Sequence, residues 1–210
     1  FILTICKMYV IVIKTNIPMS TTNIQLQPRV IIFTAPSGAG KTAISHGVMA
    51  RLPNLAFSVS ATTRLKRENE IDGKDYYFPS VDEFKKKKDN GEFLESEEVY
   101  PGIFYGTLKS EIERMAKEGK VIVFDVDVKG AASLKRYFGD SALAVSIHVP
   151  IEKLKERLIK RGTETPETLA TRLSKAQKEM EFEDDADVVI PNIDLNTAIA
   201  DAYKVIFDFL

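Results

Sequence analysis

Short apolar runs alternate with helical patterns along most of the chain. Runs suited to buried parallel strands occur at four places: Arg29–Thr34, Val121–Val126, Ala144–Val149 and Asp187–Ile190. Apolar residues spaced for one helical face follow or separate these runs: Ile44, Val48 and Leu52; Ile151, Leu154 and Leu158; Ile199, Ala202, Ile206 and Phe209. Strands that alternate with helices predict an α/β fold with a parallel sheet and right-handed crossovers.

Two segments interrupt this alternation. Residues 58–108 are rich in polar residues, tyrosines and glycines, and short alternating stretches such as Tyr76–Phe78 predict a smaller, partly β, inserted subdomain. Residues 156–172 hold several arginines and lysines near Gly162 and Pro166, and we expect a small mobile lid there. The core would then consist of three stretches: 29–57, 109–155 and 173–210.

Composition narrows the classes of function. The 29 basic and 30 acidic residues give a formal charge of −1, so no net positive field indicates bulk nucleic-acid binding. Positive charge used to bind phosphate must therefore be concentrated locally. Cys6 is the only cysteine, which excludes an intrachain disulfide, a cysteine-based zinc site and a redox pair, and favours a cytoplasmic location.

Residues 1–28 are treated as an N-terminal extension whose status the sequence leaves open. The stretch from Phe1 to Ile13 is apolar apart from Thr4 and Lys7, but a membrane span needs about 20 apolar residues. It also lacks the basic start and small-residue cleavage site of a signal peptide. Because the chain opens on phenylalanine, Met8 or Met19 is a candidate biological start, and no membrane association is expected.

A glycine-containing loop follows the first predicted strand. Ala35–Thr42 nearly matches the P-loop pattern G-x-x-x-x-G-K-[ST], with Ala35 replacing the first glycine. Gly38 and Gly40 would let backbone N–H groups turn toward phosphate oxygens. Lys41 would reach the β and γ phosphates, and Thr42 would offer its hydroxyl to Mg²⁺ at a helix N-terminus. The alternative is a glycine-rich turn that binds nothing, but the position of the loop between a strand and a helix favours nucleoside triphosphate binding. Pro36, Ser37 and Ala39 are the other expected ATP contacts.

Further motifs follow in a fixed order: Ser58–Arg67, Glu70–Tyr76, Phe93–Glu95, Tyr105–Thr107, Asp125–Asp127, Arg161–Thr165 and Arg172–Leu173. In this order the chain resembles the guanylate kinases, whose patterns are P-S-G-x-G-K, S-x-S-x-T-T-R-x-x-R, G-x-D-Y, F-[IL]-E, Y-G-[ST], D-x-D and R-G-T-E-T. The resemblance runs from about Arg29 to the C-terminus. It implies a P-loop NTPase-type parallel sheet flanked by helices, with an inserted GMP-binding subdomain and a small lid.

The resemblance also implies a reaction and a set of site residues. The reaction is transfer of the γ-phosphoryl group of ATP to GMP, with dGMP an expected second acceptor, to give ADP and GDP for GTP supply. The acceptor phosphate would be held by Arg64, Arg67, Tyr76 and Tyr105, and the guanine by Ser60, Glu95, Thr107 and Asp127. Besides Lys41, the implied catalytic groups are the lid residues Arg161 and Arg172, with Arg157 a further candidate; Asn192 would lie near the adenine.

The chemistry of these residues agrees with that assignment. Planar guanidinium groups bind phosphate through paired hydrogen bonds. A carboxylate such as Glu95 accepts both N1–H and N2–H₂ of guanine, whereas adenine would leave it facing a lone pair at a cost of about 1–3 kcal/mol or more. Asp125, at a strand end, would either approach Mg²⁺ through water or cap the strand.

Two other functions remain open from the sequence alone. One is a non-enzymatic guanylate-kinase-like scaffold domain, although such domains typically have degraded P-loops and Lys41 is intact here. The other is a kinase for a different acceptor, such as AMP or a ribose phosphate, against which Glu95 argues. The oligomeric state, monomer or dimer, is also left open.

Overall fold

The computed structural model describes residues 28–162, 165–181 and 183–210. The expected N-terminal extension, apart from Pro28, lies outside these residues. Thr163 and Glu164 of the expected lid motif lie outside them as well. Within the described part of the chain, no helix has the length and apolar character needed to cross a membrane.

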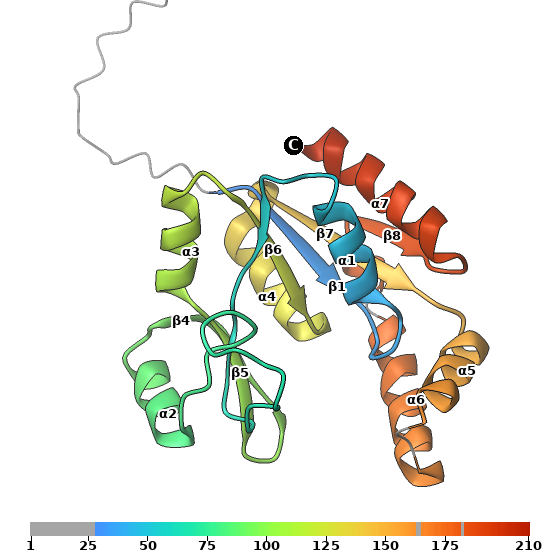
Figure 1. Ribbon diagram of the computed structural model, residues 1–210, viewed down its shortest axis with the longest axis horizontal. Helices are drawn as coiled ribbons and strands as arrows, with labels where there is room; N and C mark the ends of the chain where they lie inside the picture. Colours follow the sequence, from blue (N-terminus) through green and yellow to red (C-terminus); the bar gives the residue numbers. More distant parts are fainter. Residues whose placement is uncertain (1–27, 163–164, 182) are drawn as a thin grey trace, which may run out of the picture.

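A parallel sheet of five strands forms the centre of the molecule (Figure 1). In spatial order its strands are β2 (Leu55–Phe57), β6 (Val121–Val126), β1 (Val30–Thr34), β7 (Ala142–His148) and β8 (Val188–Pro191). The register places Ile32 of β1 beside Phe124 on one side and Ala144 on the other. The predicted parallel α/β fold is therefore confirmed, although β2 was not predicted and β7 begins two residues before the predicted strand.

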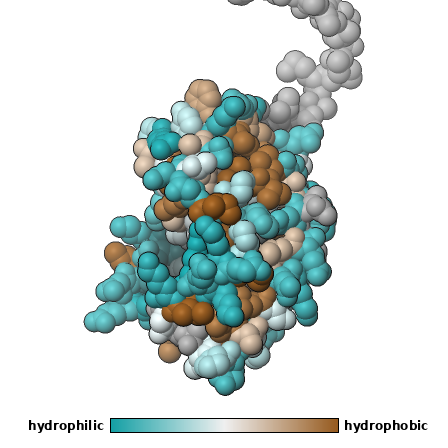
Figure 2. Space-filling model, turned by 90° about the vertical axis from the view of Figure 1, so that its right-hand side faces the viewer, coloured by the Kyte–Doolittle hydropathy of each residue, from teal (hydrophilic) through white to brown (hydrophobic). Residues whose placement is uncertain are grey.

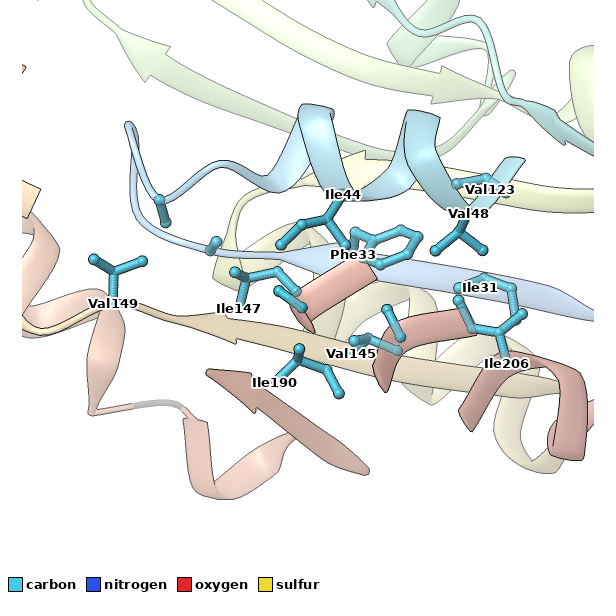
Figure 3. Packing of buried hydrophobic residues seen from close by; sticks show 14 of the residues in the cluster. Ile31, Phe33, Ile44, Val48, Val123, Val145, Ile147, Val149, Ile190 and Ile206 are labelled. Atoms are coloured by element: carbon cyan, nitrogen blue, oxygen red, sulfur yellow. The ribbon is translucent and has the colours of Figure 1, made fainter. Parts of the chain in front are cut away.

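The central strand β1 is buried on both faces, which explains its continuous apolar run. Ile31 and Phe33 face the helices α1 (Lys41–Met49) and α7 (Leu195–Phe209). Figure 3 shows Ile44 and Val48 of α1 above Phe33, with Ile206 of α7 nearby. Val30 and Ile32 face the opposite helices, α3 (Lys109–Lys117) and α4 (Val128–Phe138).

The helix α1 is shorter than its apolar spacing predicts. It ends at Met49, so Leu52 lies beyond the helix and not on its face. The prediction is wrong here because Pro53 follows, and a residue before proline is disfavoured in helical conformation. Leu52 still packs against the same apolar cluster.

Three strands and a helix between Ala61 and Leu108 form a second, smaller unit, and its bounds at 58–108 stay a prediction. Its sheet is antiparallel, in the order β3 (Ala61–Thr62), β5 (Ile103–Leu108) and β4 (Phe93–Tyr100). The helix α2 (Val81–Asp89) begins at a capping box, in which the Ser80 and Glu83 side chains each bond to the other's backbone N–H. Ala61, Phe84 and Phe93 form a small core of their own.

Two further helices, α5 (Ile151–Arg161) and α6 (Pro166–Met180), pack against each other. Figure 1 shows this pair and the β4–β5 unit projecting on either side of the ends of the central strands. Leu154 and Leu158 anchor α5 in the main core. Two short 3₁₀ turns, Gly139–Ser141 and Glu183–Asp185, complete the described elements. Motion of residues 156–172 as a lid stays a prediction.

Candidate active site

A cavity of about 810 Å³ opens at the carboxyl ends of β1 and β6. Four parts of the chain supply most of its lining: the loop after β1, the strands β4 and β5 of the smaller unit, the end of β6 with the start of α4, and the helices α5 and α6. The expected site residues among its walls are Ala35, Pro36, Ser37, Gly38, Gly40, Lys41, Thr42, Ser60, Tyr76, Glu95, Tyr105, Asp125 and Asp127. The fold thus gathers most of the candidate residues, which are spread over the sequence, around one space.

The conformation of the P-loop depends on its glycines. Gly38 and Gly40 have φ values of 95° and 91°, which residues with a side chain rarely adopt. A Cβ at Gly40 would also lie 2.4 Å from Nδ2 of Asn192. Ala35 needs no such freedom, because no non-glycine residue in the described ranges has a positive φ. Alanine therefore replaces the usual first glycine without backbone strain.

Three polar side chains meet where β1 and β6 end. Lys41 Nζ lies 2.7 Å from Asp125 Oδ1 and donates to the Val126 carbonyl at 2.7 Å. Thr42 Oγ1 donates to Asp125 Oδ2 at 3.1 Å. Asp125 thus orients both P-loop side chains. Nearby, Asp127 caps the N-terminus of α4, where its carboxylate accepts a hydrogen bond from the Gly130 N–H at 2.9 Å.

Side chains from distant elements hold the P-loop backbone. Asn192, after β8, donates from Nδ2 to the Ala39 carbonyl at 2.6 Å, and Arg157 of α5 donates to the same carbonyl at 3.2 Å. Arg157 also donates to the Asn192 carbonyl at 2.8 Å. Nothing in the described part of the chain donates to the buried Oδ1 of Asn192. This acceptor is buried, and Asn192 is not part of the cavity wall in this structure.

The two lid arginines differ in what the structure shows of them. Arg172 of α6 donates to Ser37 Oγ at 3.3 Å, which brings it onto the P-loop. Arg161 is the last residue of α5, and its side chain lies outside the described residues.

On the opposite wall, Glu95 pairs with Thr107, which is fully buried and not itself part of the wall. They face each other on β4 and β5, and Thr107 Oγ1 donates to Glu95 Oε1 at 2.7 Å. Burial raises the pKa of Glu95, and the nearby carboxylates of Asp127 and Glu97 raise it further, although the Thr107 hydrogen bond opposes them. Glu95 is therefore an acid whose surroundings disfavour its ionised form.

Aromatic rings and guanidinium groups lie next to this pair. The Arg64 guanidinium stacks 5.0 Å from the Tyr76 ring, and the Tyr76 and Tyr105 rings meet edge to face at 6.1 Å. Arg64 binds both carboxylate oxygens of Glu70, at 2.7 and 2.5 Å, which lowers the pKa of Glu70 to about 2. The exposed Arg67 contacts Glu70 through its backbone N–H, at 2.8 Å. Neither arginine is part of the cavity wall in this structure.

Some cavity residues were missed by the sequence reading. Lys175 and Glu179 of α6 lie three and seven residues after Arg172, and their charged atoms are 3.6 Å apart. Helical spacing from Arg172 was the signal that would have found them. Glu97 lies two residues after Glu95 on β4, so strand alternation would have found it. Glu70 had no such local signal.

The face that carries α7 and β8 has a different character. Figure 2 shows apolar side chains interrupting a largely hydrophilic surface there. The exposed apolar residues of these two elements include Val189, Leu195 and Phe207. The polar candidate residues are gathered elsewhere, at the cavity. In the described ranges, no group of three or more His, Cys, Asp or Glu residues is arranged to hold a metal ion by itself.

Comparison with known proteins identifies the family. The family model described as guanylate kinase matches residues 27–208. The chain belongs to the guanylate kinase family. Curated guanylate kinases similar to it include that of Bacteroides fragilis, 50% identical over 185 residues that cover 88% of this chain and 91% of the relative. That of Salinibacter ruber is 49% identical, over 86% of this chain and 96% of the relative.

A solved structure agrees. The crystal structure of guanylate kinase from Anaplasma phagocytophilum superposes with a TM-score of 0.68 at 27% sequence identity, covering 86% of this chain and 85% of that one. The guanylate kinase relationship thus extends over nearly the whole described fold, including both walls of the cavity.

Proposed function

We propose that this guanylate kinase family member is an active enzyme that transfers the γ-phosphoryl group of ATP to GMP, and to dGMP, giving ADP and GDP. The observation that carries the proposal is the cavity of about 810 Å³, which is lined on one wall by an intact P-loop and on the other by Glu95 and its neighbours. Two nucleotides bound to these walls would face each other, as direct phosphoryl transfer requires.

The P-loop wall supplies what a triphosphate needs. Gly38 and Gly40 expose backbone N–H groups, and Lys41 carries a positive charge into the cavity. Asn192, whose Nδ2 donates to the Ala39 carbonyl, is assigned to the adenine side of the loop. Ser37 contributes through its contact with Arg172.

The same wall fits a magnesium ion. Thr42 and Asp125 present a hydroxyl and a carboxylate 3.1 Å apart, and Mg²⁺ prefers oxygen ligands together with water and phosphate. When bound with ATP, Mg²⁺ would neutralise part of the triphosphate charge. Asp125 has a second task, since it holds Lys41 at the end of β6.

The opposite wall is suited to GMP. Glu95 would accept hydrogen bonds from N1–H and N2–H₂ of guanine, with Thr107 already positioned against it and Ser60 and Asp127 at the same wall. Because the guanine N1–H and N2–H₂ donors favour the carboxylate form of Glu95, GMP binding should lower the raised pKa of Glu95. The acceptor phosphate is assigned to Arg64, Arg67, Tyr76 and Tyr105.

The transfer step needs no protein nucleophile in this proposal. Lys41 and the lid arginines Arg161 and Arg172 would balance the charge of the migrating phosphoryl group. Arg172 is close enough to the loop to do this, because it contacts Ser37. Exclusion of water by α5 and α6 would limit hydrolysis of ATP.

An acceptor-specificity assay tests the proposal. Turnover of ATP would be measured with GMP, dGMP, AMP, UMP and CMP. We expect kcat/KM for GMP to exceed that for AMP by at least about 10²-fold, because adenine would leave Glu95 unpaired. Turnover of another acceptor without turnover of GMP would refute the proposal. If the protein were a scaffold, it would bind Mg·ATP weakly and show no turnover with any acceptor. The cytoplasmic location of the protein stays a prediction.

A further inference from the structure

A buried carboxylate lies beneath the acceptor wall, outside the cavity. Glu111, in the first turn of α3, is only 3% exposed. It accepts a hydrogen bond from the Val59 N–H at 3.3 Å and another from the Tyr77 hydroxyl at 3.3 Å. The Arg114 guanidinium donates to it at 3.0 and 2.8 Å. A buried ion without such partners would be costly, so these contacts fix where Glu111 lies.

The partners of Glu111 are the immediate neighbours of residues assigned to GMP. Val59 precedes Ser60, and Tyr77 follows Tyr76. The two segments also pair directly, because the Tyr77 N–H donates to the Ser60 carbonyl at 2.9 Å. Glu111 itself follows Thr107 by four residues, across the junction of β5 and α3. One carboxylate therefore joins three segments that each carry a guanine- or phosphate-binding side chain.

These contacts lie where the chain crosses between the two units. The Ser58 N–H still donates to the Val123 carbonyl of the main sheet, at 2.9 Å, and the next N–H donates to Glu111. The returning chain leaves β5 at Leu108 and enters α3. Glu111 thus connects the incoming and the outgoing crossing at the base of the acceptor wall.

We propose that Glu111 is a positioning residue for the GMP site, which sets the spacing between Ser60, Tyr76 and Thr107 by binding Val59 and Tyr77. The inference rests on the proposed function. Glu111 is absent from the cavity wall, so it acts through its neighbours and not by touching the substrate. Although burial raises the pKa of Glu111, hydrogen bonds from Arg114 and Val59 lower it overall, which keeps an acceptor oxygen available for each partner.

The test separates positioning from general stability. At a temperature well below the melting point of each variant, Glu111→Ala should raise the KM for GMP by about tenfold and leave the KM for ATP within about twofold of wild type. Glu111→Gln should restore part of the GMP affinity, because its amide oxygen can still accept from Val59, whereas its amide nitrogen would face the Arg114 Nε–H. Glu113→Ala is the matched control: this carboxylate is exposed on the same helix, so its loss should leave the GMP KM nearly unchanged.

Tyr77→Phe provides a second variant that removes only the hydroxyl donor. It should raise the GMP KM by a smaller factor and add nothing when combined with Glu111→Ala. The inference would be overturned if Glu111→Ala changed the KM for GMP and the KM for ATP by the same factor. It would also be overturned if the GMP KM stayed within about twofold of wild type in both Tyr77→Phe and folded Glu111→Ala. A wild-type enzyme that does not use GMP would overturn the proposed function and this inference together; an active wild type with unaffected variants would overturn this inference alone.

Discussion

The two walls of the cavity are built in different ways. The P-loop wall comes from consecutive residues, Ala35–Thr42, whose shape depends on backbone conformation at Gly38 and Gly40. The acceptor wall comes from side chains scattered between Ser60 and Asp127, whose positions depend on contacts such as Thr107 with Glu95. A triphosphate can be bound by backbone N–H groups of one turn, whereas reading a base requires several side chains at set distances.

The walls also differ in how their charges are balanced. On the P-loop wall, Lys41 and Asp125 form an ion pair at 2.7 Å. On the acceptor wall, Glu95 is surrounded by further acids, and burial raises its pKa. Glu95 must be ionised to accept both guanine donors, but its surroundings disfavour the ionised form. An ionised Glu95 should therefore lower the folding stability of the nucleotide-free protein. Substitutions on each wall can test this difference.

The largest effect is expected from Lys41→Ala on the P-loop wall. We expect kcat to fall by roughly 10²–10³-fold, because one preorganised cation next to the transferred group is lost. The melting temperature should stay close to that of wild type, since the Asp125 side chain is 29% exposed and remains hydrated. A coupled assay and thermal unfolding measure both. The exposed Lys88 of α2 supplies the control, Lys88→Ala. An unchanged kcat would mean that the P-loop wall does not act on the phosphoryl group.

A smaller loss of activity is expected from Glu95→Gln on the acceptor wall. The amide would place a donor against a donor of guanine, so kcat/KM for GMP should fall by about 10²-fold. The KM for ATP should not change, because the P-loop wall is built independently. Steady-state kinetics with each substrate varied in turn measure this. If kcat/KM fell by the same factor for GMP and for ATP, the two walls would not be independent of each other.

The same variant tests the stability cost. The folded-state pKa of Glu95 is raised, so folding stability falls as pH rises from the unfolded-state pKa to the folded-state pKa. Nucleotide-free Glu95→Gln should therefore melt above wild type at about pH 8 and like wild type at about pH 3, where Glu95 is protonated in both states. Glu98→Gln is the control, since Glu98 lies on the same strand but outside the cavity wall. A lower melting temperature for Glu95→Gln at pH 8 would remove the proposed cost.

The sequence predicted the features that are local in the chain. The P-loop, the strand β1 before it and the helix after it follow from contiguous residues and a periodic pattern. The apolar runs of β6 and β7 were sufficient for the same reason, since strands buried on both faces are apolar along most of their length. The edge strand β8 was also found by its apolar run, although only Ile190 of it is buried. The acceptor residues were predicted only through the resemblance to guanylate kinases.

What the sequence could not supply depends on distant contacts. The strand β2 has three residues, and it becomes a strand because Leu55–Phe57 pair with β6. Glu111 lies 52 residues from Val59, and no periodicity relates them. Glu70 carries no signal of its own, because its role exists only once the loop brings it to Arg64. Local patterns do not encode which side chains meet across such separations.

The smallest effect is expected from Glu70→Gln, which compares Glu95 with an acid outside the cavity wall. The Arg64 guanidinium lowers the folded-state pKa of Glu70 to about 2, so the stability that this pair contributes is present above the unfolded-state pKa and is lost as pH falls toward 2. The variant should melt about 1–3 °C below wild type at neutral pH, with the difference narrowing in acid. The exposed Glu68 provides the control variant, Glu68→Gln, which should show no such trend. Glu70→Gln and Glu95→Gln should therefore shift the melting temperature in opposite directions at neutral to alkaline pH, because one acid is paired with a cation and the other is buried among acids. Shifts of the same sign in both variants would show that the two carboxylates do not differ as their surroundings require.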